Sequence, residues 1–341
     1  MKALVLPEHG GMERLLLDPH FPDPVAGPGD VVVRVRACSL NHHDVFTRRG
    51  MPGIRISMPA IMGLDTAGVI ETIGPDVEGW AVGDRVLIDP INRIEGGLMG
   101  ETVHGGLAEL VRARAHQLIR LADDISFADA AALPCAYGTA LRMIRTIGQV
   151  QAGETVLLLG ASGGVGVCSL MLAKLAGATV IACASNPEKM ARLLELGADH
   201  VINYAEQDFM KATHDLVGKP RIRGDGGVNV VVNFTGGDTW VKSLRCLKVG
   251  GRLLTCGATA GYAPHEDIRF IWTFELNIRG SNGWSRDDVL QLIELVRSKQ
   301  LKVPIDKIYP LDHAINALTD MEDRHSFGKL IVAPEPALAE A

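Results

Sequence analysis

Hydrophobic and polar positions alternate with two different periods along the chain, and the clearest change of period lies near its middle. From Glu154 to Gly160, strand-forming residues lead into a glycine cluster. The chain then carries apolar residues spaced by three or four positions, which predict one apolar face of a helix: Val165, Cys168, Leu172 and Leu175. Gly177 follows, where a helix commonly ends. The pattern therefore predicts a strand, a glycine turn and a helix in direct succession.

The glycines of this turn read G-x-x-G-x-x-G, one residue longer than the common G-x-G-x-x-G. Glycine permits a tight turn and a close approach of the backbone to a pyrophosphate, and the N–H groups at the start of a helix attract an anion. We therefore predict that a dinucleotide binds here, at Gly160, Ser162, Gly163, Gly164, Val165 and Gly166. The alternative is an ordinary tight turn between a strand and a helix.

After the glycine turn, predicted strands and helices alternate as a parallel sheet requires. The strand candidates are residues 155–159, 179–183, 200–202, 228–233, 252–256 and 277–279. Six strands match a doubly wound dinucleotide fold. A helix is predicted over 284–300, because Ser285 with Asp288 three residues later is typical of a helix start.

The first 120 or so residues predict a second, β-rich domain, because short alternating segments are bounded there by glycine and proline turns. Its strand candidates are residues 2–6, 31–36, 67–73, 85–88 and 107–111. The segments 308–309 and 329–332 are expected to return to this domain as strands. Residues 334–341 are expected to form a mobile tail.

Length and composition limit the function classes. A chain of 341 residues suits two domains, and 47% hydrophobic with 5% aromatic residues predicts aliphatic cores in a soluble protein. A net charge of −6 with scattered basic residues argues against nucleic-acid binding. The uncharged stretch 155–173 is apolar enough to suggest a membrane span, but its central glycines and its strand-then-helix pattern argue against one. A short apolar N-terminal run and six cysteines without a C-x-x-C pair indicate a cytoplasmic protein with reduced thiols.

Several motifs of the chain occur together in one known family. They are the N-x-x-D segment of 41–44, the G-x-D-x-A-G turn of 63–68, the G-x-x-V-G-D-R-V turn of 79–86, G-G-L-A-E at 105–109 and the glycine turn. With them, nearly the full length resembles the medium-chain dehydrogenase/reductase superfamily of alcohol dehydrogenases and quinone reductases. The resemblance implies an α/β protein in which a GroES-like β-barrel catalytic domain (1–125 with 284–341) is split around a Rossmann domain (126–283). It also implies an active site in the cleft between them and a homodimer or homotetramer, joined near Ile278.

The resemblance raises the question of zinc. Zinc-dependent members bind the catalytic ion through a cysteine, a histidine and a second cysteine, and the aligned positions here are Asn41, Leu64 and Cys135. Catalytic zinc normally needs three protein ligands, and an asparagine amide is a poor one while leucine is none. The segment aligned with the family's four-cysteine zinc lobe, residues 90–99, holds no cysteine. We therefore expect no metal, which points to the quinone and enone reductase branch.

The end of the second Rossmann strand indicates the cofactor. An NAD enzyme usually carries a carboxylate there for the ribose hydroxyls, whereas this chain has Ser185-Asn-Pro-Glu-Lys189. In NADPH-using relatives, residues matching Ser185, Lys189 and Tyr204 contact the 2′-phosphate, so NADP(H) is the expected cofactor. A solvated surface lysine is the alternative for Lys189. Further cofactor contacts are expected from His42, Thr139, Thr235, Gly257, Ala258 and Thr259, although plain loops would also explain the last four.

Reduction of an enone or a quinone places negative charge on a carbonyl oxygen, which needs a proton or hydrogen-bond donor. His43 occupies the family's proton-relay position, and Asn41 and Tyr137 are further donor candidates for a small-molecule substrate. A turn-capping histidine and a buried tyrosine bonded to backbone are the alternatives. We expect an NADPH-dependent, zinc-independent oxidoreductase acting on a quinone or an activated C=C bond. The rivals are an alcohol dehydrogenase with a variant or zinc-free site, using Cys135 with Asp65 or His43, and a non-catalytic NADP(H)-binding protein.

Overall fold

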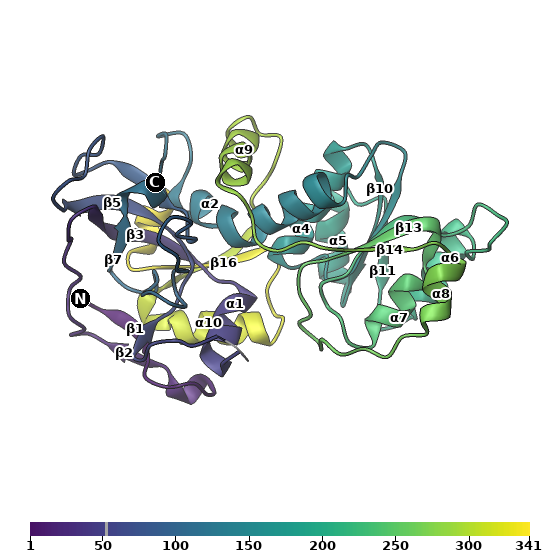
Figure 1. Ribbon diagram of the computed structural model, residues 1–341, viewed down its shortest axis with the longest axis horizontal. Coiled ribbons are helices and arrows are strands. Elements are labelled where there is room, and N and C mark those ends of the chain that lie inside the picture. Colours follow the sequence, from purple (N-terminus) through teal and green to yellow (C-terminus); the bar gives the residue numbers. More distant parts are fainter. Residues whose placement is uncertain (52–53) are drawn as a thin grey trace. The chain divides into compact units, whose positions relative to one another are not determined.

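The computed structural model describes residues 1–51 and 54–341, which form two compact units (Figure 1). The first unit comprises residues 1–135 and 303–341, and the second comprises residues 136–302. The helix predicted over 284–300 is present as α9 (Arg286–Arg297), and Ser285 and Asp288 form the expected capping box. In the structure α9 belongs to the second unit.

The first unit is built mainly of short antiparallel strands. One sheet has the order β15-β16-β3-β5-β6-β8, with β7 also paired to β3, and a smaller one has the order β2-β1-β4. The strands are β1 (Ala3–Leu6), β2 (Leu16–Asp18), β3 (Asp30–Ser39), β4 (Ala60–Ile61), β5 (Asp65–Ile73), β6 (Arg85–Ile88), β7 (Leu110–Arg114), β8 (Leu118–Arg120), β15 (Ile305–Pro310) and β16 (Lys329–Ala333). Among the strand pairs described in this first unit, only β15–β16 is parallel.

Helices and short helical turns join these strands. They are α1 (His42–Arg49), α2 (Phe127–Ala131), α10 (Ala314–Glu322) and α11 (Pro336–Ala339), with 3₁₀ turns at Met12–Arg14, Ala115–Gln117 and Leu311–His313 and a π-helical turn at Leu133–Gly138. The prediction that residues 334–341 form a mobile tail is wrong, because Ala339 in α11 is fully buried and the Phe127 N–H donates to the Ala341 carbonyl.

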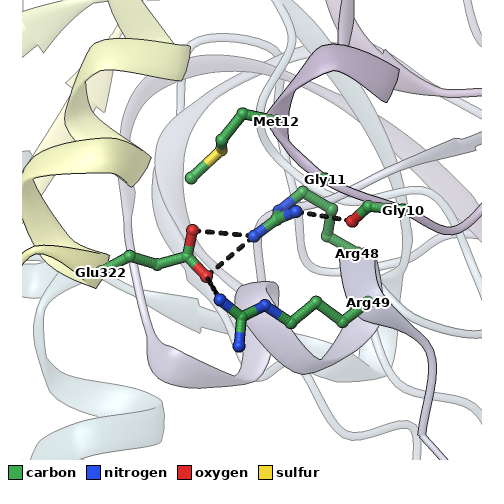
Figure 2. A pocket seen from close by; sticks show the side chains of 6 residues that line it. All are labelled: Gly10, Gly11, Met12, Arg48, Arg49 and Glu322. Atoms are coloured by element: carbon green, nitrogen blue, oxygen red, sulfur yellow. Dashed lines mark hydrogen bonds and ion pairs between the residues drawn. The ribbon is translucent and has the colours of Figure 1, made fainter.

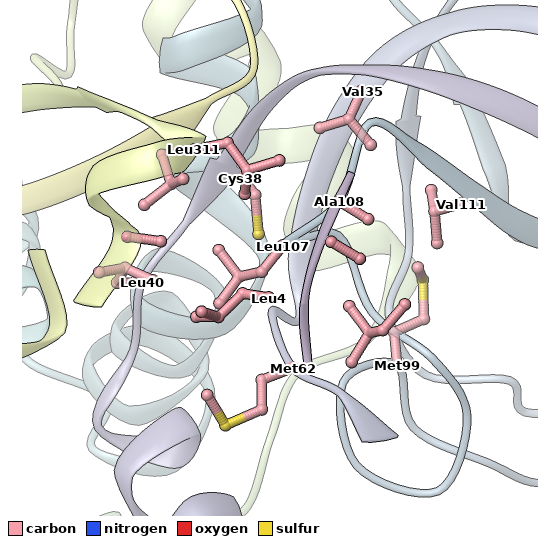
Figure 3. Packing of buried hydrophobic residues seen from close by; sticks show 14 of the residues in the cluster. Leu4, Val35, Cys38, Leu40, Met62, Met99, Leu107, Ala108, Val111 and Leu311 are labelled. Carbon is pink, nitrogen blue, oxygen red and sulfur yellow. The ribbon is translucent and has the colours of Figure 1, made fainter. Parts of the chain in front are cut away.

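The core of the first unit is aliphatic, as the composition predicts (Figure 3). Side chains from segments distant in sequence meet in it: Leu4, Val35, Cys38, Leu40, Met62, Met99, Leu107, Ala108, Val111 and Leu311. Gly63 passes close to this cluster with a φ of 98°, and an added Cβ would lie 2.6 Å from the Cys38 sulfur. Both the backbone conformation and the lack of space therefore require glycine at position 63, the first residue of the G-x-D-x-A-G turn.

The second unit is a parallel six-stranded sheet of order β11-β10-β9-β12-β13-β14. Numbered within the unit, this is the 3-2-1-4-5-6 order of a Rossmann domain, which confirms the predicted doubly wound fold. The strands are β9 (Thr155–Leu158), β10 (Thr179–Ala184), β11 (His200–Asn203), β12 (Val228–Val232), β13 (Leu247–Thr255) and β14 (Asn277–Gly280). The helices besides α9 are α3 (Thr139–Leu141), α4 (Gly164–Leu175), α5 (Pro187–Glu195), α6 (Phe209–Val217), α7 (Thr239–Leu244) and α8 (Ile268–Thr273), with a π-helical turn at Arg142–Ile147.

The uncharged stretch 155–173 is divided between β9 and α4, as its pattern predicts. Among the helices that the structure describes, none combines the length and the apolar character needed to cross a bilayer.

Candidate cofactor and active site

The glycine turn between β9 and α4 is packed so closely that side chains are excluded. Gly160 has a φ of 64°, and an added Cβ would lie 2.8 Å from the Phe234 ring. An added Cβ at Gly166 would lie 2.3 Å from the Gly160 carbonyl oxygen. Gly163 caps α4 and has no side chain to occupy the N–H groups of the first helical turn. The turn therefore has the shape and the donors of a phosphate cradle, to which Ser162, Gly164 and Val165 also belong.

The three residues predicted to contact a 2′-phosphate lie in the segments that follow β10 and β11. Ser185 follows β10, and the Tyr204 N–H donates to the Ala184 carbonyl at 3.0 Å, so Tyr204 lies beside it. Asn186 caps α5 by accepting from the Lys189 N–H at 2.9 Å. Lys189 is only 6% exposed, so it is not the solvated surface lysine considered as the alternative.

Two loops at the carboxyl edge of the sheet are joined through their backbones. The Ala260 N–H donates to the Thr235 carbonyl at 2.7 Å, and the Thr259 N–H donates to the Phe234 carbonyl at 3.2 Å. Asn233 orders the first loop from within, since its Oδ1 accepts the N–H of Thr235 at 2.9 Å. The structure therefore brings the predicted residue Thr235 next to the loop of Gly257, Ala258 and Thr259, at the edge where open α/β sheets bind ligands.

Tyr137 and Thr139 lie before α4 in the second unit. The Tyr137 side chain is fully buried, and its hydroxyl donates to the Lys302 carbonyl at 3.3 Å. The prediction of Tyr137 as a proton donor therefore needs correction, because the hydroxyl is buried and bonded to backbone. Thr139 begins α3, which packs against α4. Its cofactor contact stays a prediction.

In the first unit, Asn41 and Asp44 form the start of α1. The Asn41 N–H donates to Asp44 Oδ2 at 2.8 Å, and the Gly63 N–H donates to Asp44 Oδ1 at 3.0 Å. Burial raises the pKa of Asp44, while the two N–H groups favour its charged form. Asp44 is therefore a structural residue that holds the Asn41 turn.

The amide of Asn41 has partners on both of its ends. Its Nδ2 donates to the Ser39 carbonyl at 3.1 Å and to Asp65 Oδ2 at 2.9 Å, and its Oδ1 accepts from Lys329 Nζ at 2.8 Å. Asn41 is 6% exposed. Because both N–H groups of the amide already donate hydrogen bonds, the amide has no N–H left to donate to a substrate oxygen unless the network rearranges. The amide instead orders a buried polar network.

His43 is the second residue of α1, and its imidazole pairs with a carboxylate that the sequence did not single out. His43 Nε2 lies 2.8 Å from Glu101 Oε2, and the two side chains are 23% and 10% exposed. A carboxylate beside an imidazole fixes the orientation of the ring. Glu101 lies in the loop 89–109, whose path the sequence pattern does not determine. His42, at the first position of α1, is exposed, and its cofactor contact stays a prediction.

A cavity of about 400 Å³ lies beside α1, lined by Gly10, Gly11, Met12, Arg48, Arg49 and Glu322 (Figure 2). Arg48 is buried and donates to the Gly10 carbonyl at 2.6 Å and to both oxygens of Glu322 at 2.8 Å. Arg49 is 2.8 Å from the same carboxylate. Both guanidinium groups are thus paired with a carboxylate of the protein, which fits a structural role better than recognition of an acidic substrate.

Known proteins resemble the whole chain. Residues 27–123 match the family model for the alcohol dehydrogenase GroES-like domain, and residues 164–298 match the model for a zinc-binding dehydrogenase. A quinone oxidoreductase of Mus musculus is 32% identical over 96% of this chain and 96% of its own length. The chain belongs to the medium-chain dehydrogenase/reductase superfamily.

Two further superfamily members widen the comparison. An acryloyl-coenzyme A reductase of Sulfurisphaera tokodaii is 28% identical over 98% of this chain and 100% of its own. The crystal structure of an NAD-dependent alcohol dehydrogenase is 33% identical with a TM-score of 0.88, covering 98% of this chain and 99% of that one. Members with different substrates therefore share the architecture, so the site residues must decide the function.

Catalytic zinc, which the superfamily implies, does not fit the aligned residues of this chain. Leu64 is buried in the core, and the Asn41 oxygen holds the Lys329 ammonium. Within residues 1–51 and 54–341, no three His, Cys, Asp or Glu side chains are grouped so that they would hold a metal ion. A buried ammonium also repels a second cation. A dinucleotide, by contrast, fits the glycine turn, where a Cβ would fill the cradle.

Proposed function

We propose that the protein is an NADPH-dependent oxidoreductase that reduces a quinone or an activated C=C bond without catalytic zinc. The observation that carries this proposal is the bond between Lys329 Nζ and Asn41 Oδ1, at a position where zinc-dependent members have a metal ligand. The likeness to a quinone oxidoreductase and to an acryloyl-coenzyme A reductase supports this substrate class.

The preference for NADP(H) is supported by Ser185, Lys189 and Tyr204 at the ends of β10 and β11. A hydroxyl, the N–H groups at the start of α5 and an ammonium are favourable partners for a 2′-phosphate. The exposed Glu188 in the same helical turn is the only carboxylate of the segment 185–189. NADPH supplies the hydride when bound, and the loops containing Thr235 and Gly257 to Thr259 would hold its nicotinamide.

His43 would supply the proton. Hydride addition to the electrophilic carbon leaves negative charge on the carbonyl oxygen, and the protonated imidazole donates its proton to that charge. Glu101, 2.8 Å from Nε2, would hold the ring in orientation for the transfer. The balance is then one hydride and one proton added to the substrate, with solvent reprotonating His43.

Assembly and location are also proposals. β14 lies at the edge of the Rossmann sheet, and Ile278 in it and Trp272 in α8 are exposed apolar side chains. An unpaired strand edge with apolar neighbours favours pairing with a second copy, which supports a homodimer or a pair of dimers. The six cysteines are thiols rather than disulfides, which supports a reducing, cytoplasmic location.

A substrate screen tests the proposal. The oxidation of NADPH and of NADH is followed with a panel of quinones and enones, and the reduction of NADP⁺ and NAD⁺ is followed with simple alcohols. We expect turnover with NADPH and members of the first panel. Oxidation of alcohols as the main activity would favour the alcohol dehydrogenase rival, and tight NADPH binding without hydride transfer to any compound would favour a non-catalytic protein.

A further inference from the structure

Lys329 is a lysine buried in the interior of the first unit. It begins β16 and is 3% exposed. Its ammonium donates to the Leu40 carbonyl at 2.7 Å and to Asn41 Oδ1 at 2.8 Å. Burial of an ammonium is unfavourable unless hydrogen bonds and opposite charge compensate it. Asp65 and Asp44 provide that charge, since both carboxyls favour the protonated form of Lys329, although burial has the larger effect and lowers its pKa.

The bonds of Lys329 continue into a chain that crosses the unit. Asn41 links Lys329 to Asp65: its Oδ1 accepts from Lys329, and its Nδ2 donates to Asp65 Oδ2 at 2.9 Å. Asp65 Oδ1 in turn accepts from the Cys135 N–H at 3.0 Å. The network therefore connects the start of β16, the turn between β3 and α1, the start of β5 and the π-helical turn at Leu133–Gly138. The second of these connected segments contains the first residues of α1.

We propose that Lys329 is a positioning residue that acts through Asn41 to hold the first turn of α1, and with it His43, in the geometry that delivers a proton. Its two acceptors, Leu40 and Asn41, directly precede α1, and Asn41 is the cap of that helix. His43 follows two residues later, so the placement of its imidazole against Glu101 depends on the cap. This inference rests on the proposed function where it takes His43 as the proton donor.

The cluster has one cation and two carboxylates in its interior, so its charges have to be considered in any variant. Lys329→Met alone would leave Asp65 and Asp44 buried without their cation, and the protein would lose stability for that reason alone. Above about pH 7, where Asp65 is ionised, Lys329→Met combined with Asp65→Asn removes one charge of each sign. An asparagine at 65 retains an oxygen that accepts from Asn41 or from the Cys135 N–H. Comparison of the double variant with Asp65→Asn therefore isolates the contribution of Lys329.

The test uses the full-length protein and three measurements. Thermal unfolding establishes that each variant is folded. Hydrogen–deuterium exchange, followed by mass spectrometry of peptides covering residues 40–49, reports the order of α1 without reference to any reaction. Steady-state rates with NADPH and the best acceptor found in the screen give kcat and the KM for NADPH. Lys307→Met on the neighbouring strand β15, where the lysine is exposed, is the matched control and is expected to behave as the wild type.

We expect the double variant to be folded, to exchange the α1 amides about tenfold faster than Asp65→Asn, and to lose about 10- to 100-fold in kcat with little change in the KM for NADPH. Exchange and kcat equal to those of Asp65→Asn would overturn the proposal, and so would a lower kcat without faster exchange in α1. If the wild type itself reduces no acceptor, the proposed function fails, and the exchange data alone then decide whether Lys329 holds the turn.

Discussion

Asp65 is a fully buried carboxyl group whose pKa is raised from 3.8 to about 7. Burial is the main cause, and it outweighs the opposing effects of the Lys329 charge and of the hydrogen bonds from Asn41 and Cys135. The folded protein therefore retains a proton on Asp65 at pH values where the unfolded chain has already lost it. Asp44, the other buried carboxylate of the cluster, adds to this effect by repulsion.

The sign of the pH dependence follows from linkage. Because the unfolded chain binds fewer protons than the folded protein between about pH 4 and pH 7, the stabilising contribution of Asp65 is lost as the pH rises through this window. We predict that the free energy of unfolding decreases from pH 5 to pH 8 in the wild type, and that Asp65→Asn reduces this decrease. Urea unfolding at the two pH values measures both. An equal decrease in the two proteins would contradict the assignment to Asp65.

The pairing of His43 with Glu101 leads to a prediction about the rate of the reaction. His43→Asn removes the proposed general acid, and we expect kcat to fall by roughly 10²- to 10³-fold because general acid catalysis contributes an effect of this order. Glu101→Gln should have a smaller effect in the same direction, since it removes only the carboxylate 2.8 Å from the ring. The control is His116→Asn, a histidine in a surface hydrogen bond to Asn92. Steady-state kinetics with unchanged rates for His43→Asn would exclude it as the donor.

At the level of elements, the turn between β9 and α4 limits which side chains fit. We predict that Gly166→Ala lowers the free energy of unfolding by about 1–3 kcal/mol. The new Cβ would lie 2.3 Å from the Gly160 carbonyl oxygen, which belongs to backbone that cannot move aside. The affinity for NADPH should fall as α4 shifts. The control is Gly224→Ala in the loop before β12, where the nearest atom to a new Cβ would be 3.6 Å away. Thermal unfolding and fluorescence titration with NADPH provide the readouts, and wild-type behaviour of Gly166→Ala would contradict the packing argument.

The position of Lys189 in the first turn of α5 leads to a prediction about the choice between NADPH and NADH. Lys189→Ala should weaken NADPH binding by about 10- to 100-fold, since a hydrogen bond to a charged group contributes about 1.5–3 kcal/mol. NADH lacks the 2′-phosphate, so its affinity should stay nearly constant. Lys211→Ala, an exposed lysine in the first turns of α6, is the control. Dissociation constants for both nucleotides decide the question, and an equal loss for NADPH and NADH would assign Lys189 a structural role instead.

Elements with a strong local pattern could be predicted from the sequence. The strand and helix around the glycine turn and the capping box at Ser285 are present as expected, because their signals depend on neighbouring residues. The sequence did not predict that the segment 334–341 packs against the first unit, because this packing depends on contacts with residues distant in sequence, such as the hydrogen bond from the Phe127 N–H to the Ala341 carbonyl. Glu101 could not be predicted for a similar reason, since a loop without periodicity determines its position.

At the scale of the whole molecule, the sequence predicted the two-part architecture, because each part has its own pattern of alternation. The polar network of the first unit was predicted only in part. The motif alignment identified Asn41 and the loss of the metal ligands, whereas Lys329 was known only as the first residue of a predicted strand. Its role depends on hydrogen bonds that link three segments distant in sequence: Lys329 bonds to Leu40 and Asn41, and Asn41 bonds to Asp65. Local pattern carries no information on such a meeting.

The central claim is that a superfamily member can reduce its acceptor without a metal where Asn41, Leu64 and Cys135 replace the ligands of zinc. The most direct measurement is elemental analysis of the purified protein, together with the rate of NADPH oxidation before and after dialysis against a chelator. We predict no stoichiometric zinc and an unchanged rate. One zinc ion per chain, with activity that is lost on chelation and restored by added zinc, would contradict the account.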